Sequence, residues 1–195
     1  MNLLPQQPHA PRRSQVRAPL VLCTLLAACA LAAPASRAAA VAPEATRLVV
    51  LPFEFFDASI DQRPQLLRWQ QAWLRGMPRQ FEQALQRADP GVRVIDTPRV
   101  RSDERALAGD YAHPSTCGPC LLRLGRRADA DYVLSASVRK VSDLILYLQA
   151  RLIDPRRGTV AAQYLLEVKA DNADMWRRAA QHLARQVAHR LDGVH

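Results

Sequence analysis

Cys117-Gly118-Pro119-Cys120 is the part of the sequence whose residue types and spacing point most directly to chemistry. Two thiols separated by two residues can close a disulfide with each other, and a helix that begins at the first cysteine lowers the pKa of its thiol. The other two cysteines, Cys23 and Cys29, lie in a segment that we expect to be processed on export. The sequence therefore indicates one cysteine pair in the mature protein.

We favour a structural disulfide between Cys117 and Cys120, because an exported protein meets an oxidising compartment. A loop this short contributes on the order of 2 kcal/mol, so the bond would fasten the start of a helix more than it would secure the fold.

Two other uses of the pair stay open. Thioredoxins use the same tetrapeptide for redox chemistry, but they place it directly after a buried strand, whereas a long polar loop precedes Cys117 here. A metal site would need more ligands, since one cysteine pair cannot complete a tetrahedral zinc site, and His113 could add only a third. Haem attachment is disfavoured because Leu121, not His, follows Cys120.

Other catalytic motifs are absent from the sequence, which has no Gly-rich phosphate loop, no GxSxG and no HExxH. Two pairs of acids remain, Asp57 with Asp61 and Asp171 with Asp174, and we interpret them as caps of turns and helices. His182 and His189 lie seven residues apart, and we interpret them as solvated side chains of one helix. We assign no catalytic residue, no metal ligand and no cofactor.

Residues 1–40 have the composition of an export signal. Three arginines precede an uncharged apolar run over residues 18–33, which is short for a membrane span, so a retained anchor is the less favoured reading. Small residues allow cleavage near 35 or near 40. Leu26-Ala27-Ala28-Cys29 also matches a lipobox, in which Cys29 would carry a lipid, and we place the soluble product slightly ahead of this lipidated one.

Four of the nine net positive charges of the chain come from this leader. Residues 1–40 hold four of the 27 basic residues and none of the 18 acidic ones, which leaves a net charge of +5 for residues 41–195. The remaining basic residues are scattered, which is typical of a solvated surface and not of a nucleic-acid groove. We therefore expect no nucleic-acid partner.

Residues 41–195 are long enough for one domain with its own core. The apolar patterns predict a strand at 46–53, a loop at 54–63, a long helix from Pro64 to Ala88 with a kink at Gly76 and Pro78, and a strand at 91–96. Two shorter helices are the fallback for the kinked one. Trp69 and Trp73, one turn apart, are expected in the core rather than in a ligand platform.

The second half of the domain reads as a helix, three strands and a helix. A short helix is predicted around 103–107, and a further helix follows with Ser115 or Thr116 as its N-cap. Three antiparallel strands come next, over 131–141, 143–154 and 159–168. The alternation places Leu144 on the buried face of the second strand. A last helix begins with Asp174 as its N-cap or first-turn acid. The predicted fold is α+β: a mixed sheet of about five strands in the order strand, helix, strand, helix, three-strand meander, helix.

Several short segments resemble a known group of envelope proteins. LVVLPF, ADADYVLSASV and LIDPRRG occur in the layout of the amino-terminal domain of TolB and of related lipoproteins of the curli-secretion and penicillin-binding-protein-activator types. KVSDLIL and DNADMW are similar to an exported bacterial family catalogued as a domain of unknown function. The resemblance implies an adaptor that binds other proteins, and it carries over no catalytic residue.

The leading hypothesis is thus a non-enzymatic periplasmic or envelope-associated binding protein with an envelope protein partner. A lipid anchor on Cys29 would add membrane association. The alternatives are a thiol–disulfide redox protein that uses Cys117 and Cys120, and an accessory protein that binds a metal or a small ligand.

Overall fold

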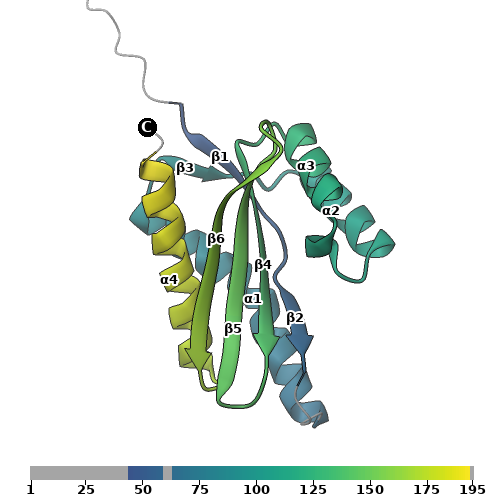
Figure 1. Cartoon of the computed structure of the whole chain (residues 1–195), viewed down its shortest axis with the longest axis vertical. Coiled ribbons are helices and arrows are strands. Elements are labelled where there is room, and N and C mark those ends of the chain that lie inside the picture. Colours follow the sequence, from purple (N-terminus) through teal and green to yellow (C-terminus); the bar gives the residue numbers. More distant parts are fainter. Residues whose placement is uncertain (1–43, 59–62, 194–195) are drawn as a thin grey trace, which may run out of the picture. The chain divides into compact units, whose positions relative to one another are not determined.

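The computed structural model describes residues 44–58 and 63–193, which form an α+β unit (Figure 1). The predicted fold class is confirmed, although the sheet has six strands instead of about five. The elements in chain order are β1 (Thr46–Val50), β2 (Glu54–Asp57), α1 (Pro64–Ala88), β3 (Val92–Val94), α2 (Pro98–Asp110), the 3₁₀ turn η1 (Pro114–Thr116), α3 (Gly118–Arg127), β4 (Tyr132–Lys140), β5 (Ile145–Asp154), β6 (Thr159–Lys169) and α4 (Ala173–Asp192).

The sheet is mixed, with the order β3-β1-β4-β5-β6. β1 lies parallel to β3 and β4, whereas β4, β5 and β6 form the predicted antiparallel meander. The sixth strand is β2, which pairs in parallel with the second half of β4. The prediction of a loop from Glu54 was therefore wrong. Pro52 interrupts the first strand, but Phe55 and Phe56 continue it along the same neighbour.

One face of the sheet is covered by α1 and α4, which pack side by side (Figure 1). Each helix has an apolar stripe at helical spacing, and the even-numbered residues of β4 and β5 face these stripes. Trp176 of α4 is fully buried there and contacts Trp69 of α1 at 5.9 Å between ring centroids. Trp69 and Trp73 of α1 are partly buried and pack against the core, in agreement with the prediction of core packing. The main core includes Leu48, Phe81, Leu85, Leu134, Leu148, Leu152, Trp176, Leu183 and Val187.

The other face of the sheet is covered at one end only. There α3, with α2 beside it, buries a second cluster that includes Val49, Leu121, Leu124, Val133 and Ile153. Gly125 of α3 packs so tightly that an added Cβ would lie 2.7 Å from both Pro155 and Val133. The remainder of this face has no helix over it (Figure 1).

Four local predictions need correction. α1 is one helix with Pro78 inside it, so the fallback of two helices is wrong. α2 has 13 residues instead of about five, because Thr97 caps it by accepting a hydrogen bond from the N–H of Val100. The N-cap of α3 is Cys117 and not Ser115 or Thr116, which belong to η1.

The fourth correction concerns the turn between β4 and β5. Leu144 was predicted on the buried face of β5, but it lies in the turn before the strand and is 71% exposed. The Ser142 hydroxyl accepts hydrogen bonds from the N–H groups of Leu144 and Ile145, which turns the chain before the alternation begins. The predicted hairpin at residues 154–158 is confirmed, with Gly158 at φ +73°.

Candidate functional site

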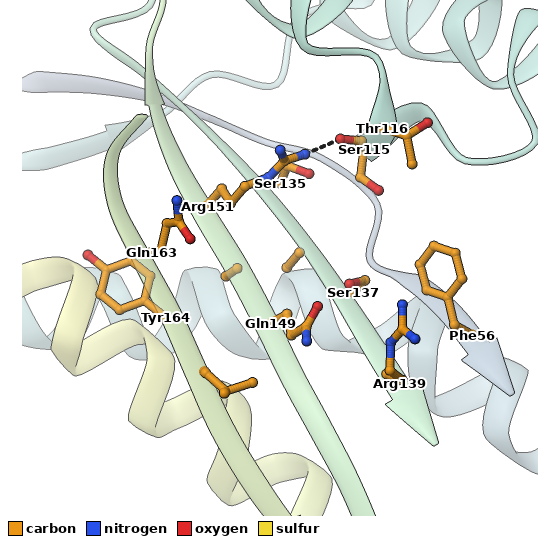
Figure 2. A pocket seen from close by; sticks show the side chains of 13 residues that line it. Phe56, Ser115, Thr116, Ser135, Ser137, Arg139, Gln149, Arg151, Gln163 and Tyr164 are labelled. Atoms are coloured by element: carbon orange, nitrogen blue, oxygen red, sulfur yellow. Dashed lines mark hydrogen bonds between the residues drawn. The ribbon is translucent and has the colours of Figure 1, made fainter. Parts of the chain in front are cut away.

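We call the part of this sheet face that no helix covers the open face. It carries mainly polar side chains. Three strands supply it in register: Ser137 of β4 lies opposite Gln149 of β5, which lies opposite Leu165 of β6. The next row along consists of Ser135, Arg151 and Gln163. Figure 2 shows the polar side chains of both rows on the sheet, with Arg139 at the end of β4 and Phe56 on β2 beside it. Together with Ser115 and Thr116 they line a cavity of about 610 Å³.

The chain segment before α3 forms one wall of this cavity and is held by Glu54 of β2. One carboxylate oxygen of Glu54 accepts a hydrogen bond from the N–H of Ser115, and the other accepts from the Ser115 hydroxyl, each at 2.6 Å. The carbonyl of Ser115 in turn accepts a hydrogen bond from the Arg151 guanidinium (Figure 2). These contacts explain why the long connection between α2 and α3 reaches across the sheet.

The cavity is positively charged. Its lining includes two arginines and no acidic residue. Arg139 is exposed and lies 5.7 Å from the centroid of the Phe56 ring, a cation–π distance. Arg151 is partly buried, and its bond to the Ser115 carbonyl fixes its direction. Such a surface suits polar and acidic groups of a partner, because guanidinium groups pair with carboxylates through several N–H donors.

Ser115, Glu54 and His113 come together as a serine, an acid and a histidine, but they do not form a catalytic triad. The Ser115 hydroxyl contacts Glu54, whereas His113 Nδ1 lies 3.6 Å from the same carboxylate and its ring stacks on Phe56 at 4.2 Å. A triad needs the histidine between the nucleophile and the acid, so that the histidine can take the hydroxyl proton. This arrangement fastens the loop instead.

The cysteine pair lies beside the cavity and not within it. The structure joins Cys117 to Cys120 in a disulfide with the two Cα atoms 5.3 Å apart. Cys120 is buried in the second core cluster, and Cys117 packs against that cluster. The bond spans the first turn of α3 and directly follows Thr116 of the cavity wall. His113, considered above as a third metal ligand, contacts Phe56 and Glu54.

No group of three or more His, Cys, Asp or Glu side chains is placed to hold a metal ion within residues 44–58 and 63–193. His182 and His189 both line a groove beside β6. Cys29 and Asp61 lie outside the described residues.

Asp171 is not the cap that the sequence suggested. The cap of α4 is Asn172, which accepts from the N–H of Met175, while Asp174 is the first-turn acid. Asp171 instead accepts hydrogen bonds from Trp176 Nε1 and Gln70 Nε2, and it lies 3.3 Å from Lys140 Nζ.

Lys140 is fully buried at the end of β4. Burial lowers its pKa, but contacts with Asp143 and Asp171 outweigh burial and raise the pKa above its ordinary value. This polar cluster fixes the β4–β5 turn to the start of α4.

The predicted strand at 131–141 contains Ser135, Ser137 and Arg139, but no site was predicted there. Gln149, Arg151 and Gln163 were also missed, although they occupy alternate positions of the next two predicted strands. The alternation alone does not show that these side chains lie side by side, because that depends on the register of the three strands. Which end of this face the helices leave uncovered cannot be read from the alternation.

A family model described as Protein of unknown function (DUF2380), and named DUF3280, matches residues 46–187. The chain belongs to this family. The match includes both KVSDLIL and DNADMW, whose residues Lys140, Asp143, Asp171 and Trp176 form the buried polar cluster. The predicted membership of a family of unknown function is confirmed.

Three of the solved structures that are similar to this chain have low sequence identity to it. Lipoprotein GNA1162 from Neisseria meningitidis is 16% identical, with 73% of this chain and 96% of that chain covered and a TM-score of 0.47. The LpoB C-terminal domain from Salmonella enterica is 11% identical, covers 67% and 87%, and has a TM-score of 0.41. TolB from Acinetobacter baumannii is 13% identical, covers 76% and 29%, and has a TM-score of 0.38.

No curated protein matches the sequence. Among the described residues, none of the helices has the length and apolar character needed to cross a membrane.

Proposed function

We propose that this protein is an exported, non-enzymatic binding or adaptor module of the cell envelope, and that its open face binds a protein partner. Residues 1–40 would direct export, with cleavage near 35 or 40 or lipidation at Cys29, and residues 41–195 would form the single binding domain. The observation that carries the proposal is the cavity on the open face. It presents Arg139, Arg151 and neutral polar groups, without an acid and without a nucleophile that contacts a histidine.

Charge reversal tests this proposal. Arg139→Glu changes an exposed side chain at the edge of the cavity, and Arg178→Glu makes the same charge change on the exposed surface of α4, outside the cavity. The tagged protein would be expressed in its own cells, crosslinked and purified from the envelope fraction. We expect the unmodified protein and Arg178→Glu to retain one discrete partner, and Arg139→Glu to lose it. Equal recovery with both variants, or no envelope partner at all, would refute the role of the open face.

The disulfide supports a second candidate, a thiol–disulfide redox protein. Cys117 is the N-cap of α3, where the helix dipole would stabilise a thiolate, but Cys120 is 6% exposed. The reduction potential of the pair and insulin reduction by the purified protein separate the two candidates. A potential below about −300 mV without turnover is expected for a structural bond. A potential above that value with turnover would establish the redox function instead.

A further inference from the structure

The strand β6 forms one edge of the sheet. In the part of the chain that the structure describes, its 11 residues pair only with β5, so the outer side of β6 presents backbone donors and acceptors. The strand contains no proline, and its apolar residues Val160 and Leu165 are 44% and 66% exposed. Long edges with exposed apolar side chains readily accept another strand, and most proteins block them. On this side the Arg190 guanidinium of α4 donates a hydrogen bond to the Ala161 carbonyl.

A basic groove of about 590 Å³ runs between this edge and α4. Its floor includes Ala162 and Tyr164, and its rim carries four cationic or titratable side chains of α4: His182, Arg185, His189 and Arg190. None of the residues that line it is acidic. Figure 2 shows the Tyr164 hydroxyl directed away from the open face, beyond the edge of β6. Tyr164 is the one residue that lines both this groove and the cavity on the open face, and its ring lies between the two.

The Tyr164 hydroxyl is buried and has no hydrogen-bond partner within the described residues. A buried polar group of this kind costs free energy until a partner satisfies it. Burial raises the pKa of Tyr164, although Arg190 nearby lowers it, so the hydroxyl keeps its proton and can donate to an acceptor. The groove therefore offers guanidinium donors at its rim and one hydroxyl donor at its floor.

We propose that an extended acidic segment of another protein binds here by adding a strand to the edge of β6. Its backbone would pair with β6, and because side chains alternate along a strand, every second residue would enter the groove. Acidic residues at these positions would meet Arg185, Arg190 and the Tyr164 hydroxyl. This site is additional to the open face and does not depend on the function proposed for that face.

Charge argues for this occupant over two others. The leader of this chain cannot supply the segment, since residues 1–43 contain no Asp or Glu. A second copy could pair through its own β6 about a two-fold axis perpendicular to the sheet. This pairing would bring the two α4 helices together on one side of the sheet, so that Arg185 and Arg190 of one copy would face Arg185 and Arg190 of the other. Such like-charge contacts disfavour association.

The test uses the purified full protein and synthetic nine-residue peptides with blocked ends, measured by fluorescence anisotropy at about 0.15 M salt. The first peptide alternates Glu with Val and Thr. The second has Lys in place of Glu. The third keeps every Glu but carries N-methyl groups on alternate backbone nitrogens, which prevents strand pairing and leaves the charge unchanged. We expect only the first peptide to bind.

Protein variants complete the test. Arg185→Glu with Arg190→Glu should weaken binding of the Glu peptide at least about 10-fold, and Arg185→Glu alone, which leaves the Arg190 contact intact, should weaken it less. Arg178→Glu, on the same helix but outside the groove, should change it less than about 2-fold. Binding of the N-methylated peptide, equal effects of the Arg185 and Arg178 variants, dimerisation through β6 without peptide, or absence of binding would each overturn the proposal.

Discussion

Replacing Asp171 by Asn should destabilise the domain by about 3 kcal/mol, at the low end of the range for breaking a buried ion pair. The Asp171 side chain is 3% exposed and lies 3.3 Å from the fully buried Lys140. The substitution removes one of the two negative charges beside Lys140 and places an amide N–H₂ where Gln70 now donates. Asp143, at 2.7 Å from Lys140 but half exposed, remains and limits the loss.

Thermal and urea unfolding, followed by circular dichroism, measure this effect. For a domain of this size 3 kcal/mol corresponds to a decrease in Tm of about 6–12 °C. Asp174→Asn is the matched control, because Asp174 is an exposed first-turn acid paired with Arg177 on the surface, where the expected loss is about 0.5 kcal/mol. A loss from Asp171→Asn no larger than that from Asp174→Asn would refute the reasoning.

A double-mutant cycle isolates the pair. Lys140→Met alone should also destabilise the domain, since it leaves Asp171 buried without its cation. The double variant should lose roughly 1–3 kcal/mol less stability than the sum of the two single losses.

The same cluster predicts that the stability of the domain depends on pH in the alkaline range. Because the pKa of Lys140 is raised above 10.5 in the folded state, its contribution is complete below pH 10.5 and is lost as pH rises through the folded pKa. Lys140→Met should lose this alkaline component.

Three further predictions follow from packing and titration. Gly125→Ala should destabilise the protein by about 1–3 kcal/mol through overpacking against Pro155. Gly76→Ala, in the middle of α1, would place its Cβ 3.8 Å from the Gln80 side chain and should stabilise the protein by roughly 0.5–1 kcal/mol. A change in the free energy of unfolding of the same sign for both variants would contradict the packing described. Leu144→Asp should change the free energy of unfolding, measured with urea, by less than about 0.5 kcal/mol, since the side chain is 71% exposed. A large loss of stability would instead support the buried position that the sequence first predicted.

The third concerns Glu104, whose pKa is raised to about 7 by burial and by Asp96 and Glu82, against a lowering effect of Arg101. The folded state thus holds this proton more tightly than the unfolded state, and stability should fall as pH rises from about 4.5 to 7. Glu104→Gln should flatten that part of the profile and add about 1 kcal/mol at pH 8, after allowance for solvent screening; an unchanged profile would contradict it.

The sequence predicted the order and type of most elements because their apolar periods are long and regular. α4 repeats over more than five turns, and the meander alternates over three strands joined by a hairpin with clear turn residues. β2 was missed because four residues next to Pro52 are too few for a period. Leu144 was misplaced because the alternation of β5 extends, in the sequence alone, into the turn that Ser142 makes.

The candidate site was largely hidden from the sequence for a different reason. Arg139, Gln149 and Gln163 are ordinary polar residues of strands until the register places them in adjacent rows and the helices leave that part of the sheet uncovered. The cysteine motif drew attention first because its chemistry is local. The role of Asp171 was missed because its partners Gln70 and Lys140 lie 101 and 31 residues earlier in the chain.

The most direct test of the central claim is photocrosslinking in living cells from single positions of the protein. A photoreactive residue at position 149, exposed in the middle of the open face, is compared with one at position 178, exposed on α4. We predict one discrete adduct with an envelope protein from position 149, lost when Arg139→Glu is added, and no such adduct from position 178. No adduct from position 149, or the same adduct from both positions, would contradict the assignment of the open face as the binding surface.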